Sequence, residues 1–171
     1  MTGQKTLMVR RAERMALGTP YPHVVARVRE IVRAIGECTL VVDGTGVGAP
    51  VVELLRSAGL GCGVTAVTIT GGEKTTGSGG AWCVPKRDLI AGVQLALEKG
   101  ELRIARHMKD VGALVRELID VRVTAGLGTG KVRIGADGSG QHDDLVIALA
   151  LACWRARWKE NGFGTGRLTG I

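Results

Sequence analysis

The sequence predicts an α/β domain in which helices cover a sheet with a parallel core. Residues 38–43 form a short apolar run that ends in Asp43, and residues 61–70 form a second run rich in Val, Thr and Ile. Between them, a Gly-rich turn and a helical segment at 49–58 complete a strand–helix–strand order. Such a unit joins two parallel strands through a right-handed crossover. Another helix is expected at 24–35, because apolar residues recur there at helical spacing.

The remaining elements extend this pattern on both sides. Two prolines just before the first helix suit its first turn, where a missing N–H costs little. A Gly-rich stretch at 127–130 lies between two apolar runs, which is typical of a β-hairpin. The last helix is apolar nearly all round at its start, so we expect it to be buried. In chain order we expect a strand at 6–13, a turn at 17–22, a flexible loop at 71–80, a helix at 86–99 after residues 82–85, a strand at 102–105, a helix at 111–119, strands at 121–126 and 131–135, a loop at 136–140 and a helix at 143–159.

Composition favours one soluble domain. The chain has 171 residues, of which 45% are apolar and 23% charged, so it is long enough for a substantial core. We expect a single domain over residues 1–160 and a flexible basic tail over 161–171. The longest apolar run, 145–154, is about half of the roughly 20 residues that span a membrane. With no signal-peptide pattern and no C-x-x-C pair among four cysteines, the sequence predicts a reduced protein in the cytoplasm, without membrane attachment.

Two acidic positions carry the chemistry that the sequence predicts. Asp143 and Asp144 stand directly before the last apolar helix, where they are either a helix cap with a charged first turn or metal ligands. Asp43 ends a buried parallel strand, a usual place for functional side chains, although it is equally suited to capping the turn that follows. Together these carboxylates favour a site for Mg²⁺ or Mn²⁺, which prefer oxygen ligands. Two such ions would stabilise the attacking and leaving oxygens of a phosphodiester cleavage.

His142 and three basic residues each have a functional and an ordinary structural interpretation. His142 is either a cap or a donor and proton carrier beside the metal ligands. The net charge of +7 favours a polyanionic partner. Lys74, Lys86 and Arg87 are therefore candidate phosphate contacts, with ordinary solvated charges as the alternative.

The Gly-rich turn after Asp43 also allows a nucleotide-binding interpretation. Gly44, Gly46 and Ala49 follow a strand and open a helix, as in a relaxed dinucleotide fingerprint. That fingerprint also needs an acid about 20 residues later, at the end of the second strand, where Thr68 and Thr70 stand instead. The sequence has no ATPase signature.

Four segments in order resemble one family, the C-terminal nuclease domain of phage large terminase subunits. They are residues 17–22 (LGTPYP), 41–48 (VVDGTGVG), 84–89 (VPKRDL) and 142–150 (HDDLVIALA). The resemblance implies a ribonuclease-H-like mixed sheet flanked by helices, and cleavage of double-stranded DNA with divalent metal during genome packaging in a bacterial host. It implies partners among other terminase or portal proteins. By similarity Asp43 matches the family's second acid and Asp143/Asp144 the third, with Asp144 as the direct ligand and Asp143 assisting.

The sequence departs from the family at the first acid. In the family that acid lies on the first, central strand of the nuclease domain, whereas residues 1–5 contain no carboxylate and Glu13 is at the wrong end of the wrong strand. We therefore expect an N-terminally truncated domain without the ATPase motor, with weakened or abolished cleavage. The alternative function is a catalytically dead DNA-binding or packaging-assembly module.

Overall fold

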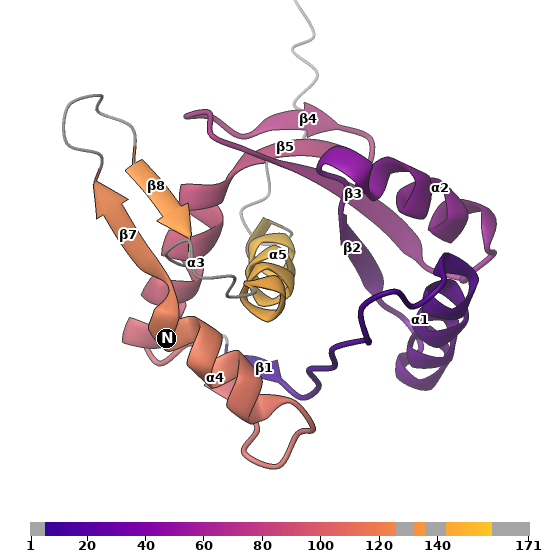
Figure 1. Cartoon of the computed structure of the whole chain (residues 1–171), viewed down its shortest axis with the longest axis horizontal. Helices are drawn as coiled ribbons and strands as arrows, with labels where there is room; N and C mark the ends of the chain where they lie inside the picture. The colour runs from indigo at the N-terminus through magenta and orange to yellow at the C-terminus, as the bar shows by residue number, and fades with distance from the viewer. Residues whose placement is uncertain (1–5, 126–131, 136–142, 159–171) are drawn as a thin grey trace, which may run out of the picture.

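The computed structural model describes residues 6–125, 132–135 and 143–158, which form a mixed α/β structure (Figure 1). The expected turn at 127–130, the loop at 136–140, His142 and the tail at 161–171 lie outside the described residues. The strands are β1 (Leu7–Val9), β2 (Thr39–Asp43), β3 (Gly63–Thr70), β4 (Thr76–Ser78), β5 (Ala81–Pro85), β6 (Leu102–Ile104), β7 (Arg122–Ala125) and β8 (Val132–Gly135). The helices are α1 (Tyr21–Ile35), the short 3₁₀ helix η1 (Gly46–Gly48), α2 (Ala49–Ser57), α3 (Lys86–Glu98), α4 (Val111–Asp120) and α5 (Asp144–Trp158).

The largest sheet has the strand order β2-β3-β5-β4. β2 pairs with β3 and β3 with β5, both in parallel, while β4 pairs antiparallel with β5. The predicted strand–helix–strand unit is thus confirmed as β2-α2-β3. Because β2, β3 and β5 are parallel, their carboxyl ends lie at one edge of the sheet, here called the carboxyl edge.

Each face of this sheet has its own apolar core. Leu40 and Val42 of β2 pack with Val25 of α1 and Leu55 of α2. The alternate residue Val41 faces the other way, because successive side chains of a strand point to opposite faces, and it joins the core around α5. Figure 1 shows α1 and α2 on one face of β2 and β3, and α5 on the other face.

Helix α5 is the central element of the larger core. Val146 and Ala150 are almost fully buried, and the same core includes Leu7 of β1 and Val84 of β5. The prediction of a buried last helix is therefore confirmed. Two smaller sheets complete the fold: β1 pairs in parallel with β6, and β7 and β8 form the predicted antiparallel hairpin.

The structure corrects several element boundaries. The segment at 71–80 was expected to be a loop, but it contains β4, because the edge of β5 offers backbone hydrogen-bond partners to three exposed residues. The first strand covers only three of the residues expected at 6–13. Residues 82–85 belong to a strand, β5, which leads directly into α3. Helix α1 begins at Tyr21, three residues earlier than expected, with Pro22 in its first turn.

An apolar cavity of about 490 Å³ lies between β1, β6, α4 and α5. Alanines of α5 line it, Ala148 and Ala152 among them, and their small side chains leave space that larger residues would fill. The lining includes neither Asp43 nor Asp143, so the cavity is separate from the acidic positions. Among the described helices, none has the length and apolar content needed to cross a membrane.

Candidate functional site

Asp43 is the last residue of β2, and its side chain is exposed at the carboxyl edge. Its Oδ1 accepts a hydrogen bond of 2.9 Å from the backbone N–H of Thr45. Thr45 Oγ1 in turn accepts one of 2.8 Å from the N–H of Ile69 in β3, and the Gly44 N–H donates to the Val67 carbonyl oxygen at 2.8 Å. One carboxylate oxygen thus caps the turn, so the turn-capping role exists, and it is compatible with a ligand role for the same group.

The glycines after Asp43 are explained by this tight turn. A Cβ at Gly48 would lie 2.6 Å from the carbonyl oxygen of Asp43, closer than side chains approach backbone. Gly46 adopts φ +59°, a left-handed conformation that glycine adopts without a steric penalty. The Gly-rich segment therefore folds back over the end of β2 and holds Asp43 in place.

Asp143 lies at the same carboxyl edge, although it belongs to a different part of the chain. Lys86, the first residue of α3, follows β5 directly, and its Nζ lies 2.6 Å from Asp143 Oδ2. The Asp143 carbonyl oxygen also accepts from the Ile147 N–H at 2.9 Å, which begins the hydrogen bonding of α5. Asp144 is the first residue of α5 and is exposed in its first turn, where the helix dipole favours a negative charge.

Glu117 of α4 is the residue of this region that the sequence analysis missed. Its side chain is nearly buried, and its Oε2 accepts hydrogen bonds from the N–H groups of Leu145 at 2.9 Å and Val146 at 3.1 Å. Arg14 pairs with its other oxygen. Glu117 therefore caps the start of α5 from a different helix. One signal was present in the sequence: Glu117 falls three residues after Leu114, on the apolar stripe of α4.

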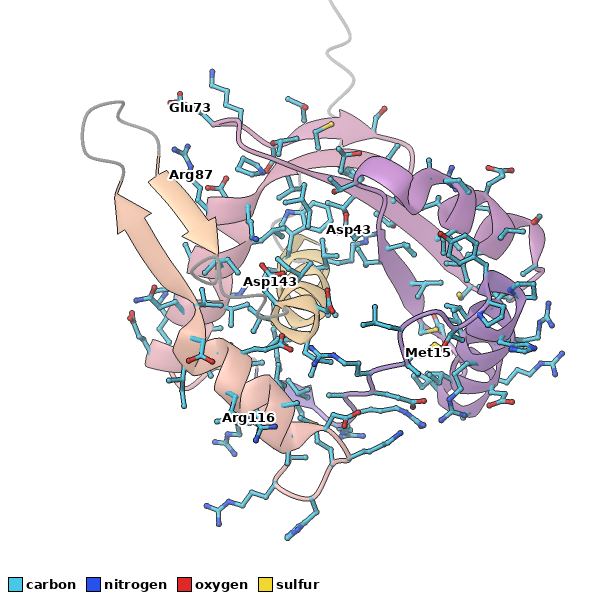
Figure 2. All side chains as sticks on the ribbon, viewed as in Figure 1. Met15, Asp43, Glu73, Arg87, Arg116 and Asp143 are labelled. Carbon is cyan, nitrogen blue, oxygen red and sulfur yellow. The ribbon has the colours of Figure 1, made fainter. Side chains whose placement is uncertain are left out.

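The predicted phosphate contacts lie around the same edge. Lys74 is exposed in the segment that leaves the end of β3, and Arg87 is exposed in the first turn of α3. Arg87 donates to the carbonyl oxygen of Glu73 at 3.1 Å, which ties that segment to the start of α3. Figure 2 shows Arg87 and Glu73 on the same side of the molecule. Lys86 differs from the prediction in one respect, because it forms an ion pair with Asp143.

The two acidic positions are offset along the strands. In the strand register, Asp43 is opposite Val67, and Val67 is opposite Trp82, which precedes Lys86 by four residues. The register therefore offsets Asp43 from Lys86, the partner of Asp143, along the strands of the sheet. Figure 2 labels Asp43 and Asp143 on their separate elements, β2 and the start of α5. Across residues 6–125, 132–135 and 143–158, no three His, Cys, Asp or Glu side chains gather closely enough to hold a metal ion. The carboxylate oxygens are the donors that Mg²⁺ and Mn²⁺ require, so the donors fit such ions in kind.

A family model, described as the terminase RNaseH-like domain, matches residues 18–155. The chain belongs to this family. The matched region contains both acidic positions together with Lys74, Lys86, Arg87 and Glu117. No curated protein and no solved structure matches the chain.

Membership of the terminase RNaseH-like family confirms the resemblance found in the sequence. The mixed sheet flanked by helices is consistent with an RNase H-like fold, as expected. The family suggests a nuclease role in DNA packaging, with DNA and packaging proteins as partners in general, and RNase H-like nuclease domains generally use divalent metals.

Proposed function

We propose that the chain is a divalent-metal-dependent endonuclease domain that cleaves double-stranded DNA during phage genome packaging, in the cytoplasm of a bacterial host. The observation that carries this proposal is the position of Asp143. The Lys86 contact holds it at the carboxyl edge where β2 ends in Asp43, so two acidic positions distant in sequence share one edge of the sheet. Membership of the terminase RNaseH-like family supports the same function.

The carboxylates have distinct proposed roles. Asp43 and Asp144 are the direct ligands of Mg²⁺ or Mn²⁺, Asp143 assists, and His142 is a neighbouring donor or proton carrier. When bound, such ions polarise the phosphodiester and lower the pKa of bound water. Thr45 and Glu117 position these ligands: Thr45 fastens the Asp43 turn to β3, and Glu117 holds the first turn of α5.

The cations at the carboxyl edge are proposed to bind DNA phosphates. Lys74 and Arg87 are exposed there, and the chain has a net charge of +7. Lys86 neutralises Asp143 in the structure, and its flexible side chain is about one-third exposed. An ammonium group in this position suits both a carboxylate and a nearby phosphate. Other terminase or portal proteins are the proposed protein partners.

One observation favours a second function. The described residues do not gather three metal-ligating side chains, which is consistent with a catalytically inactive module that binds DNA or assists assembly. Such a module would bind DNA in a salt-sensitive way, because phosphate contacts release counterions, and it would not cleave DNA with any metal.

A plasmid-nicking assay separates these functions. Supercoiled DNA is incubated with the protein while Mg²⁺ or Mn²⁺ is titrated, and the variants Asp43→Asn and Asp144→Asn are compared with the unaltered chain. The charge-matched control is Glu53→Gln, on the exposed face of α2. We expect metal-dependent nicking that both Asn variants lose and the control retains. Salt-sensitive DNA binding without nicking would support the inactive module, and nicking by both Asn variants would overturn the assigned ligands.

A further inference from the structure

Two of the four cysteines stand side by side at the opposite edge of the sheet from Asp43. Cys38 immediately precedes β2, and Cys62 immediately precedes β3. The two strands are parallel, and Thr39 is in register with Gly63, so the cysteines before them occupy matching positions. Neighbouring strands lie about 4.8 Å apart, within the range of about 4.4–6.8 Å between Cα atoms that a disulfide spans.

The two thiols also influence each other's ionisation. Burial and then the neighbouring Cys62 thiol raise the pKa of Cys38. Both thiols are free and half-buried. The other cysteines are placed differently: Cys83 is exposed on β5, and Cys153 is buried in α5, where burial raises its pKa to about 11. Cys38 and Cys62 are therefore a dithiol pair defined by the register of β2 and β3.

We propose that Cys38 and Cys62 form a dithiol site that a small disulfide such as oxidised glutathione converts into an intramolecular disulfide. The thiolate of one cysteine attacks the oxidant, forms a mixed disulfide and releases one glutathione thiolate. The second cysteine, as its thiolate, then attacks the sulfur of the first, and a second glutathione thiolate leaves. The two cysteines lose two electrons and two protons, and two molecules of reduced glutathione carry them away.

The surrounding backbone is suited to forming this bridge. Both cysteines lie outside the strands, each in a turn with a glycine of positive φ, Gly36 before Cys38 and Gly61 before Cys62. Small adjustments can therefore occur in the turns while the pairing of β2 with β3 remains. The bridge joins strands that are already neighbours, so it restrains the unfolded chain more than the folded one. Asp43, at the far end of β2, keeps its position.

The test uses the full chain, oxidised glutathione at mildly alkaline pH and tryptic mapping under non-reducing conditions. Trypsin cuts after Arg33, Arg56 and Lys74, so the bridge appears as peptide 34–56 linked to peptide 57–74. We expect this linked pair as the main intramolecular product, with the loss of two of the four free thiols and a melting temperature that rises and is restored by dithiothreitol. Cys62→Ser should abolish the linked pair and the rise in melting temperature.

The matched control is Cys83→Ser, which removes an exposed thiol and should leave the linked pair intact. The proposal is overturned if oxidised glutathione gives only mixed disulfides or dimers through Cys83. It is also overturned if peptides 34–56 and 57–74 stay separate while other thiols oxidise. None of these measurements uses DNA cleavage, so the result is independent of the nuclease proposal.

Discussion

The turn around Asp43 and the start of α5 place carboxylates at one edge of the sheet in different ways. Asp43 is held mainly by near neighbours, because its carboxylate accepts a hydrogen bond from the Thr45 N–H and Gly48 allows the chain to fold back over it. Thr45 also joins this turn to Ile69 of the adjacent strand β3. Asp143 and Asp144 depend on distant residues, since Lys86 pairs with Asp143 and Glu117 caps the first turn of α5. The Asp43 position therefore depends on near neighbours and one adjacent strand, whereas the α5 position depends on residues of two other helices, α3 and α4.

The largest expected effect is at Glu117. Glu117→Ala leaves two buried backbone N–H groups and Arg14 without the carboxylate that they bind. We expect a loss of about 3 kcal/mol in the free energy of unfolding, measured by urea denaturation. Glu117→Gln keeps an acceptor oxygen and should cost less. The control Glu98→Gln changes an exposed side chain of α3, and an equal loss in both would contradict the capping role.

The next largest effect tests the close approach of Gly48 to Asp43 in the turn after β2. Gly48→Ala places a Cβ against the backbone carbonyl of Asp43, and we expect a loss of about 2 kcal/mol, within the range for overpacking. The matched variant is Gly92→Ala in α3, where an added Cβ meets open space and should stabilise the helix by about 0.5–1 kcal/mol. Thermal denaturation measures both. Similar changes in the two variants would show that the turn is not sterically tight.

A smaller effect is expected at Lys86. Its ion pair with Asp143 joins side chains that are each 32% exposed, so it is worth about 1 kcal/mol or less. Lys86→Gln removes a cation that competes for Asp143, and Mn²⁺ binding measured by calorimetry should tighten by up to about fivefold. DNA binding should weaken. Lys109→Gln, at an exposed site before α4, is the control, and an unchanged Mn²⁺ affinity for Lys86→Gln would exclude competition at Asp143.

The smallest effect involves Glu13, whose carboxylate contacts neither acidic position. Hydrogen bonds from Arg27 and Arg11 lower the pKa of Glu13 from 4.5 to about 2. Because the folded-state pKa is lowered, the stabilisation is present above about pH 4.5 and is lost as the pH falls towards 2. We expect Glu13→Gln to remove a pH-dependent contribution of about 1 kcal/mol or less between these values. A variant with an unaltered pH profile of unfolding would contradict this.

Local patterns in the sequence were enough to predict most of the helices and strands. Apolar periodicity predicted α1, α3 and α4, and the strand–helix–strand order predicted the parallel pairing of β2 with β3. The exposed residues of β4 have no such pattern, so that strand was missed. Its existence depends on the free edge of β5, which is a property of the assembled sheet.

The sequence by itself determined the faces of the helices and the glycines of the turn after Asp43, because these depend on spacing between near neighbours. Only the tertiary structure decided which groups meet. Lys86 and Asp143 are 57 residues apart, and Glu117 and Leu145 are 28 apart. The pairing of Cys38 with Cys62 likewise follows from the register of β2 and β3. Such contacts depend on how whole elements pack, and a one-dimensional pattern records which face is buried without naming the residue it is buried against.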